Sequence, residues 1–341
     1  MLKCYVSEPP LLYVFITLVS IEIRMKSEFE FLNDLKSKYN LKHIGDDCAV
    51  LPMSNTKDLL LTADMLVEEV DFRLKWTTPE FLGHKSVAVS LSDIAAMGGT
   101  PRWAMISIAL PESLWKTDFL DRFYTGWHDL ARMHAVELVG GDISRADGAV
   151  VIDSIVGGDV VKGSAICRSG ASIGDPIFIT GFLGGAAAGL SLLENGERFD
   201  QNASPVARHL LLQQLQPLPQ VQTANILQQY ALPTSMLDIS DGLSSDLTHI
   251  LLASDAGARL VAEDIPIDPA VAGFPQGEAL KMALHGGEDY ELLFTVNKEN
   301  ISKAKDLGFH HIGEVTSNVG IIELICDNQS SILISKGYRH F

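Results

Sequence analysis

Apolar residues along this chain follow two spacings, the alternation typical of strands and the three-to-four-residue repeat typical of helices. Strand spacing predicts strands over residues 59–65, 103–110, 136–142, 149–156 and 175–181. Helical spacing predicts helices over residues 84–99 and 118–134 and, after a glycine pair, over residues 184–193. A polar, helix-prone stretch also begins at Met25. Strands and helices mixed in this way predict an α+β fold.

Residues 235–247 combine an apolar strand with an unusual number of acceptor side chains. In an extended segment Asp238 and Ser240 lie on one face, and Asp241-Gly242 then ends the strand ahead of leucines at helical spacing. One Ser or Asp is enough to cap a helix N-terminus, and three such residues are present here. The stretch therefore predicts a functional site where a strand leads into a helix.

Two more segments place small polar side chains on a single face. Thr62 and Asp64 share a face at the end of the strand predicted over residues 59–65. Ser86, Ser90 and Asp93 form a narrow stripe along the helix predicted over residues 84–99. A solvated helix face normally carries longer charged residues, so the stripe suggests close approach to a bound group.

Glycine-containing turns supply further carboxylates. Gly45-Asp46-Asp47 precedes a short apolar strand. By itself, a Gly-Asp-Asp sequence is typical of a solvated turn. The strand predicted over residues 136–142 runs into a Gly-Gly turn that presents Asp142, and a later glycine pair precedes Glu288. Neither a G-x-G-x-x-G fingerprint nor a P-loop occurs in the chain.

A cluster of these carboxylates would require cations. Two carboxylates about 4 Å apart repel by roughly 4 kcal/mol at an effective dielectric constant of about 20, so a cluster either takes up protons or binds hard cations. Oxygen ligands without Cys or His favour Mg²⁺. The carboxylates at strand ends, at turns or in the helix stripe are Asp47, Asp64, Asp93, Asp142, Asp238 and Asp241.

Length and composition predict two domains. The chain has 341 residues, of which 47% are hydrophobic, enough for more than one core. Glycines near residues 157–163 predict the boundary, giving α+β domains over residues 25–162 and 163–341, with residues 1–24 as an extension outside them. The net charge of -17 disfavours nucleic acid and anionic lipid as partners, although Mg²⁺ would allow phosphorylated substrates.

Localisation is predicted to be cytoplasmic. The four cysteines are scattered without a C-x-x-C pair, which is typical of reduced thiols in a cytosol. The apolar run over residues 11–23 is shorter than the roughly 20 residues that span a bilayer, and it contains Glu22. We therefore expect no membrane segment, with a weak anchor as the minor alternative.

Seven motifs, in this order, resemble those of the thiamine-monophosphate kinases, a family within the superfamily of aminoimidazole ribonucleotide synthetase and selenophosphate synthetase. They are Gly-Asp-Asp-Cys-Ala-Val, Thr-Ala-Asp-Met-Leu-Val-Glu, Leu-Ser-Asp-Ile-Ala-Ala-Met-Gly, Gly-Gly-Asp, Arg-Ser-Gly-Ala, Asp-Ile-Ser-Asp-Gly-Leu and Gly-Gly-Glu-Asp-Tyr-Glu-Leu. The resemblance covers about residues 29–341. It implies a two-domain aminoimidazole ribonucleotide synthetase-like fold, and a homodimer in which the N-terminal domains share a sheet.

The resemblance also implies transfer of the γ-phosphoryl group of ATP to thiamine monophosphate, giving thiamine diphosphate. Several Mg²⁺ ions would be held by Asp47, Thr62, Asp64, Asp93, Asp142, Asp238 and Asp241. ATP would contact Gly141, Asp142, Arg168 and Ser240, and thiamine monophosphate would contact Asp71, Glu288 and Tyr338. Phosphoryl transfer depends mainly on positioning and charge neutralisation, so no nucleophilic side chain is expected.

Two departures from the family pattern affect the substrate end. Asp71 stands where the family usually has His, and Ile143-Ser144 replaces Thr-Thr after Gly-Gly-Asp. Two alternatives to the kinase therefore stay open. One is an ATP-dependent synthetase of the same superfamily with another small substrate, although the reactive cysteines of its selenophosphate and hydrogenase-maturation branches are missing here. The other is a catalytically silent Mg²⁺–nucleotide binding protein.

Overall fold

The structure, a computed structural model, describes residues 28–338 and residue 340. The extension predicted over residues 1–24 lies outside the described residues. The chain forms two units, one of residues 1–41 with 340–341 and one of residues 42–339. The described part of the first unit contains α1 (Glu28–Tyr39), whose first turn carries glutamates and whose last turn carries lysines. Both charge placements favour a helix, and α1 confirms the helix predicted from the polar stretch.

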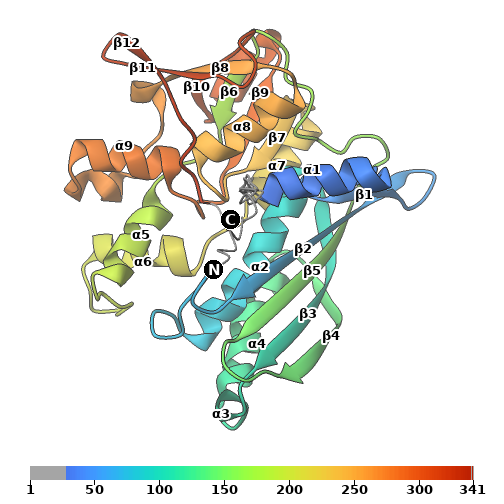
Figure 1. Ribbon diagram of the computed structural model, residues 1–341, viewed down its shortest axis with the longest axis vertical. Coiled ribbons are helices and arrows are strands. Elements are labelled where there is room, and N and C mark those ends of the chain that lie inside the picture. Colours follow the sequence, from blue (N-terminus) through green and yellow to red (C-terminus); the bar gives the residue numbers. More distant parts are fainter. Residues whose placement is uncertain (1–27, 339, 341) are drawn as a thin grey trace, which may run out of the picture. The chain divides into compact units, whose positions relative to one another are not determined.

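A five-stranded sheet forms the first half of the larger unit. Its strand order is β1 (Ala49–Pro52), β2 (Lys57–Val67), β5 (Val151–Val161), β3 (Thr100–Leu110) and β4 (Glu137–Arg145). Neighbouring strands are antiparallel except β3 and β4, which are parallel. The helices α2 (Pro79–Ala96) and α4 (Phe119–Met133) cover one face of the sheet (Figure 1), and the short α3 (Glu112–Trp115) precedes α4.

Two glycine pairs lie inside strands of this sheet, which corrects the turn predicted at Gly140-Gly141 and the connector predicted to begin at Gly157. A Cβ atom on Gly141 would lie 1.9 Å from the Ile106 carbonyl oxygen, and one on Gly157 would lie 2.2 Å from the Trp103 ring. These glycines are therefore required by close packing between neighbouring strands. The chain leaves the sheet only after Val161, and the domain boundary between residues 162 and 163 stays a prediction.

A seven-stranded sheet forms the second half of the larger unit. Its order is β12 (Gln329–Ile332), β11 (Ile322–Cys326), β8 (Gly257–Val261), β10 (His310–Thr316), β6 (Pro176–Ile179), β9 (Leu292–Val296) and β7 (Pro233–Asp238). Alternate residues of its central strands enter different cores. Ile177 and Ile179 pack in the core that includes α8 (Leu243–Ala253) and α9 (Gln276–His285), whereas Phe178 packs in the core of α2, α7 (Val221–Gln229) and α10 (Ile301–Asp306).

Helix α2 connects the two sheets. One continuous hydrophobic core includes buried residues of the first sheet, of α2 and of one face of the second sheet. The pair α5 (Gly185–Glu194) and α6 (Pro205–Leu215) packs against Trp76, which precedes α2, and against Phe81 in the first turn of α2. Side chains on α2 therefore have fixed positions relative to both sheets.

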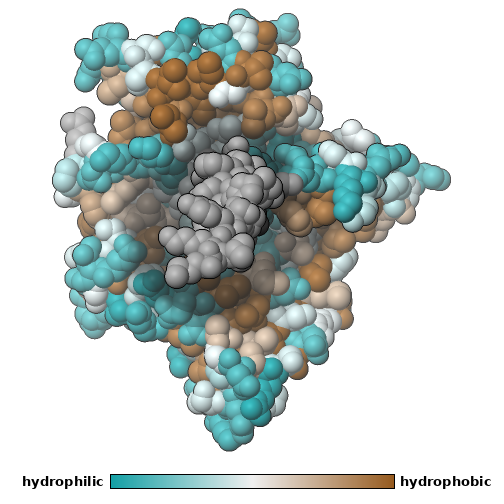
Figure 2. Space-filling view, in the orientation of Figure 1, coloured by the Kyte–Doolittle hydropathy of each residue, from teal (hydrophilic) through white to brown (hydrophobic). Residues whose placement is uncertain are grey.

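Figure 2 shows apolar surface on the larger unit near α8 and β8, among other apolar areas on this face. Exposed large apolar residues of the larger unit include Leu252 of α8 and Ile332 of β12. Within residues 28–338, no helix is long and apolar enough to cross a membrane.

Candidate active site

Three carboxylates from separate elements meet beside the C-terminal end of α2. Asp47 precedes β1, Asp93 lies in the last turn of α2, and Asp238 ends β7. One oxygen from each lies within 4.8 Å of the other two. The Asp47 Oδ2 atom is buried without a hydrogen-bond partner among the described residues, as expected of an atom whose partner is a cation. We call these three residues the carboxylate cluster.

Hydroxyl groups orient two members of the cluster. The Thr62 hydroxyl donates a short hydrogen bond to Asp93, and the Ser92 hydroxyl donates to Asp238 Oδ2 at 2.5 Å. The strand period explains the second contact, because Asp238 lies on the same face of β7 as the buried Met236, which packs in the core of α2. Both hydrogen bonds fix carboxylates that α2 and β7 bring together.

Asp64 lies beside the cluster on β2. Its Oδ2 atom accepts a hydrogen bond of 2.7 Å from the Ser90 hydroxyl on α2. Because Thr62 and Asp64 are two residues apart on one strand, both face α2 as the sequence predicted. Ser86, the third residue of the predicted polar stripe, instead donates to the Gly83 carbonyl of its own helix.

Burial and mutual repulsion raise the pKa values of these carboxylates. Burial raises the pKa of Asp93 well above its usual range, and the charges of Asp64, Asp238 and Asp47 add to the effect. Burial raises the pKa of Asp64 to about 6 and that of Asp238 to about 7. The site therefore favours protons or cations over bare negative charge. Clustered oxygen ligands of this kind fit Mg²⁺.

Arg168 supplies a positive charge at the cluster. Its guanidinium forms a short ion pair with Asp47, and its backbone N–H donates to Asp46 Oδ1 at 2.8 Å. The pKa of Asp47 is nevertheless raised, because burial outweighs the attraction of Arg168. The structure thus places Arg168, predicted to bind ATP, next to the predicted metal ligands.

Asp241 belongs to a second group. Its ligand atom lies within 4.8 Å of those of Asp246 and His249 on α8. Asp246 accepts hydrogen bonds from the backbone N–H groups of Asp241 and Gly242 at 3.1 and 2.9 Å. Asp246, a residue of the first turn of α8, therefore accepts hydrogen bonds from the backbone at the start of that helix. The N-cap residue is Gly242, which has no side chain to form a cap hydrogen bond. The helix-cap alternative for Asp238, Ser240 and Asp241 is not what the structure shows.

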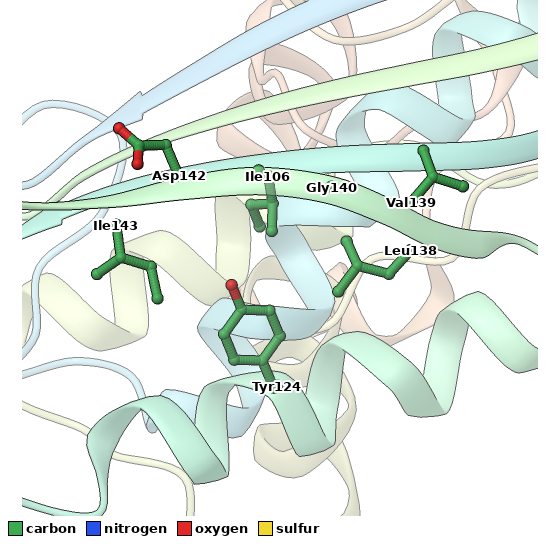
Figure 3. A pocket seen from close by; sticks show the side chains of 8 residues that line it. Ile106, Tyr124, Leu138, Val139, Gly140, Asp142 and Ile143 are labelled. Carbon is green, nitrogen blue, oxygen red and sulfur yellow. The ribbon is translucent and has the colours of Figure 1, made fainter.

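Gly141 and Asp142 lie on β4, at the edge of the first sheet. Strand register puts Gly141 in one row with Asp64, three strands away, or about 14 Å at roughly 4.8 Å per strand. Asp142 is the next residue and faces the opposite side of the sheet. Figure 3 shows its side chain on the side of β4 away from Tyr124. Within one copy of the chain, Asp142 and the carboxylate cluster therefore lie apart.

A pocket of about 490 Å³ lies between α4 and β4 (Figure 3). Tyr124 of α4 faces the residues of β4 across this pocket, and Gly141 lies on its lining. The pocket thus offers an aromatic ring beside Gly141 and Asp142, two of the residues predicted to contact ATP. Sequence analysis did not single out Tyr124, because an aromatic residue on an amphipathic helix is ordinarily a core residue.

The residues predicted for the substrate end surround Tyr338. Burial raises the pKa of Tyr338, and the charges of Asp71, Glu288 and Asp241 raise it further. The Tyr338 backbone N–H donates to the Asp241 carbonyl at 3.1 Å, and the Glu288 N–H donates to the Ser240 carbonyl at 2.8 Å. The structure therefore brings the three predicted substrate residues into one acidic neighbourhood that adjoins the loop after β7.

The other carboxylates of the Gly-Gly-Glu-Asp-Tyr-Glu-Leu motif have structural contacts. Asp289 accepts hydrogen bonds from the Gly184 and Ala186 N–H groups at the start of α5. Glu291 is buried, accepts from the Thr180 hydroxyl at 2.5 Å, and has its pKa raised to about 7 by burial.

Replacing Glu291 with Gln should make the protein less sensitive to alkaline pH. The folded-state pKa of Glu291 is raised, so its favourable contribution is complete below the unfolded pKa and is lost as pH rises through about 7. Gln mimics the protonated form. Relative to wild type, Glu291→Gln should change stability little at about pH 5 and gain on the order of 2 kcal/mol at about pH 8. Thermal unfolding at both pH values checks this, and an equal shift at both would contradict it.

Two family models match the chain, described as AIR synthase related protein, N-terminal domain, over residues 45–160 and AIR synthase related protein, C-terminal domain, over residues 172–324. The chain is 38% identical over 328 residues to a thiamine-monophosphate kinase of Buchnera aphidicola (subspecies Acyrthosiphon pisum), covering 94% of this chain and 98% of that protein. It is also 38% identical over 308 residues to the Escherichia coli K12 thiamine-monophosphate kinase, covering 87% and 91%.

A solved structure, "AaThiL complexed with AMPPCP and TMP", resembles this one with a TM-score of 0.83. The two chains are 32% identical, and the match covers 94% of this chain and 100% of the other. The similarity therefore extends over nearly the whole chain.

Proposed function

The chain belongs to the thiamine-monophosphate kinase family, and we propose on that premise that it transfers the γ-phosphoryl group of ATP to thiamine monophosphate, giving thiamine diphosphate. The carboxylate cluster carries this proposal. Its three buried carboxylates, with raised pKa values for Asp47, Asp93 and Asp238, form a site that calls for cations. Phosphoryl transfer requires such charge neutralisation and little covalent chemistry from the protein.

Mg²⁺ would be held by the cluster and by the residues around it. Thr62 and Asp64 lie next to the cluster, and Asp241 adds a ligand from the start of α8. The bound ions would neutralise charge on the transferred phosphoryl group. The hydroxyls of Ser90 and Ser92 keep Asp64 and Asp238 in place, so the ligand oxygens are oriented before substrate binds.

The residues proposed to bind ATP form two groups that lie apart within one copy of the chain. Arg168 and Ser240 lie near the cluster, whereas Gly141 and Asp142 lie about 14 Å away on β4 by the strand spacing. We propose a homodimer in which the first sheets of the two copies come together, so that Asp142 of each copy reaches the cluster of the other. Met65 on β2 and Val161 on β5 are exposed apolar residues of this sheet, as suits such an interface.

Glu288, Tyr338 and Asp71 are proposed to contact thiamine monophosphate. The Glu288 carboxylate, which keeps 27% exposure, suits the positively charged thiazolium ring, whereas Asp71 would lie nearer the phosphate, which would point toward the cluster. Arg168 offers a cation to the phosphates there. With its scattered cysteines and a nucleotide substrate, the protein is proposed to act in the cytoplasm.

A turnover assay tests the proposed function. Purified protein with ATP, Mg²⁺ and thiamine monophosphate should form thiamine diphosphate and ADP in equal amounts, measured by chromatography. Formation of ADP without thiamine diphosphate would indicate a different acceptor. Binding of ATP and Mg²⁺ without any ADP would indicate the catalytically silent protein.

Asp71→His should lower the Michaelis constant for thiamine monophosphate. Asp71 accepts a 2.7 Å hydrogen bond from the Val67 N–H, and we propose that it lies near the anionic phosphate ester of the substrate. A partly solvated charge pair at about 5 Å and a dielectric constant of about 40 costs roughly 1.5 kcal/mol, about tenfold in binding. The Michaelis constant for ATP should stay unchanged, and the Michaelis constant for thiamine monophosphate should depend less on salt concentration than in wild type. Asp71→Asn removes the negative charge without adding an imidazole ring, so it separates the two effects of Asp71→His. Loss of turnover in Asp71→His would indicate a different substrate.

A further inference from the structure

Lys85 of α2 is a buried cation that sequence analysis did not single out. It is 4% exposed, and lysines are almost never buried to this degree unless they are paired. Its Nζ lies 2.6 Å from Glu288 Oε1 and 3.5 Å from the Gln214 carbonyl oxygen. The Gln214 side-chain amide of α6 donates a short hydrogen bond to Glu288 Oε2. Both carboxylate oxygens of Glu288 are therefore held, by side chains from two different helices.

The backbone of Glu288 is fixed as well. Its φ angle of 66° lies in the left-handed region, which a residue other than glycine occupies only where the surroundings impose it. Its N–H donates to the Ser240 carbonyl at 2.8 Å. The Glu288 side chain nevertheless retains 27% exposure, so the carboxylate is anchored but still open to a ligand.

Helix α2 links this carboxylate to the carboxylate cluster. Lys85 and Asp93 are eight residues apart on α2, or about 12 Å at 1.5 Å per residue. Asp93 belongs to the cluster proposed to hold the metal ions, and Lys85 holds Glu288. A rigid helix therefore sets the separation between the phosphate end and the Glu288 end of the site.

We propose that Lys85 and Gln214 are positioning residues that hold the Glu288 carboxylate at this separation for the cationic heterocycle of the substrate. This proposal rests on the proposed function, since it assumes a substrate with a phosphate at one end and a cationic ring at the other. The site selects such a molecule because the Glu288 carboxylate is fixed and cannot move to contact a ring at a shorter or longer distance from the phosphate. Other residues are proposed to bind ATP, so we expect the pair to leave ATP binding unaffected.

Steady-state kinetics of Lys85→Met, Lys85→Arg and Gln214→Leu test the proposal. Lys85→Met should raise the Michaelis constant for thiamine monophosphate about tenfold or more and change that for ATP by less than about twofold. Lys85→Arg retains the ion pair and should recover much of the loss, and Gln214→Leu should give a smaller rise. The matched control is Lys281→Met, which removes an exposed lysine–carboxylate pair of 2.7 Å to Glu278 on α9 and should leave both constants unchanged.

A Glu288→Gln background separates positioning from general structural damage. If Lys85 acts through Glu288, adding Lys85→Met to Glu288→Gln should raise the Michaelis constant no further. A rise of both Michaelis constants, an unchanged constant for thiamine monophosphate, or a further loss in the Glu288→Gln background would overturn the proposal. Should Lys85→Met fail to fold, Lys85→Arg and Gln214→Leu decide by the same criteria. A wild-type protein that does not phosphorylate thiamine monophosphate would instead overturn the proposed function itself.

Discussion

Asp93→Asn should nearly abolish phosphoryl transfer and yet stabilise the protein in the absence of divalent cations. Asp93 lies within 4.8 Å of Asp47 and Asp238, and burial and these charges raise its pKa. Removing one carboxylate relieves repulsion among the others, and Asn still accepts the hydrogen bond from Thr62. Loss of a ligand to a catalytic metal typically removes several kcal/mol of transition-state stabilisation, on the order of a thousandfold in rate.

The two effects are measured separately. Turnover with saturating substrates should fall by about three orders of magnitude, whereas the melting temperature of the metal-free protein should rise and its increase on adding Mg²⁺ and an ATP analogue should shrink. Glu323→Gln is the matched control, because Glu323 is paired with Arg259 on the second sheet. It should lower stability slightly and retain activity. Wild-type turnover in Asp93→Asn would show that the carboxylate cluster is not the metal centre.

Mixed dimers of two inactive variants should recover activity if Asp142 acts across the dimer. Asp142→Ala and Asp238→Ala should each be inactive, since each lacks one proposed metal ligand. A heterodimer of the two contains one site with Asp238 from one copy and Asp142 from the other, so one of its two sites is intact. If Asp142 served its own chain, both sites would be defective.

Differently tagged variants, co-expressed and purified through both tags, provide the heterodimer. Its turnover should approach half that of wild type, whereas each homodimer stays inactive. A heterodimer without activity, or a monomeric wild-type protein in solution, would contradict the shared site. The reason to expect complementation is geometric: strand register places Asp142 three strands from Asp64 and on the other face of the sheet.

Local sequence patterns predicted most elements and several of the orientations. The two-residue period of β2 put Thr62 and Asp64 on one face, and the apolar repeat predicted α2, although the helix begins five residues earlier than expected, at Pro79. The seven motifs led to the family that the comparisons confirm. These features depend on residues close together in sequence, so periodicity and motif spacing are sufficient to identify them.

Glycine pairs were the weakest local signal. Gly140-Gly141 suggested a turn and Gly157-Gly158 a connector between domains, yet each pair lies within a strand. A glycine chosen for a turn and one chosen for cross-strand packing look alike in sequence. Only the neighbouring strand, with the Ile106 carbonyl or the Trp103 ring, distinguishes the two.

The sequence by itself determined the fold family, the positions of the acidic residues at strand ends, and the kind of chemistry that such residues support. Only the tertiary structure decided which of them meet: Asp47, Asp93 and Asp238 in one cluster, Asp241 with Asp246 and His249, and Asp142 on the opposite face of the sheet. It also brought Lys85 and Gln214 to Glu288 across more than 70 residues. The physical reason is that distances between elements remote in sequence are set by how helices and sheets pack around a shared core, and periodicity within one element carries no information about that packing.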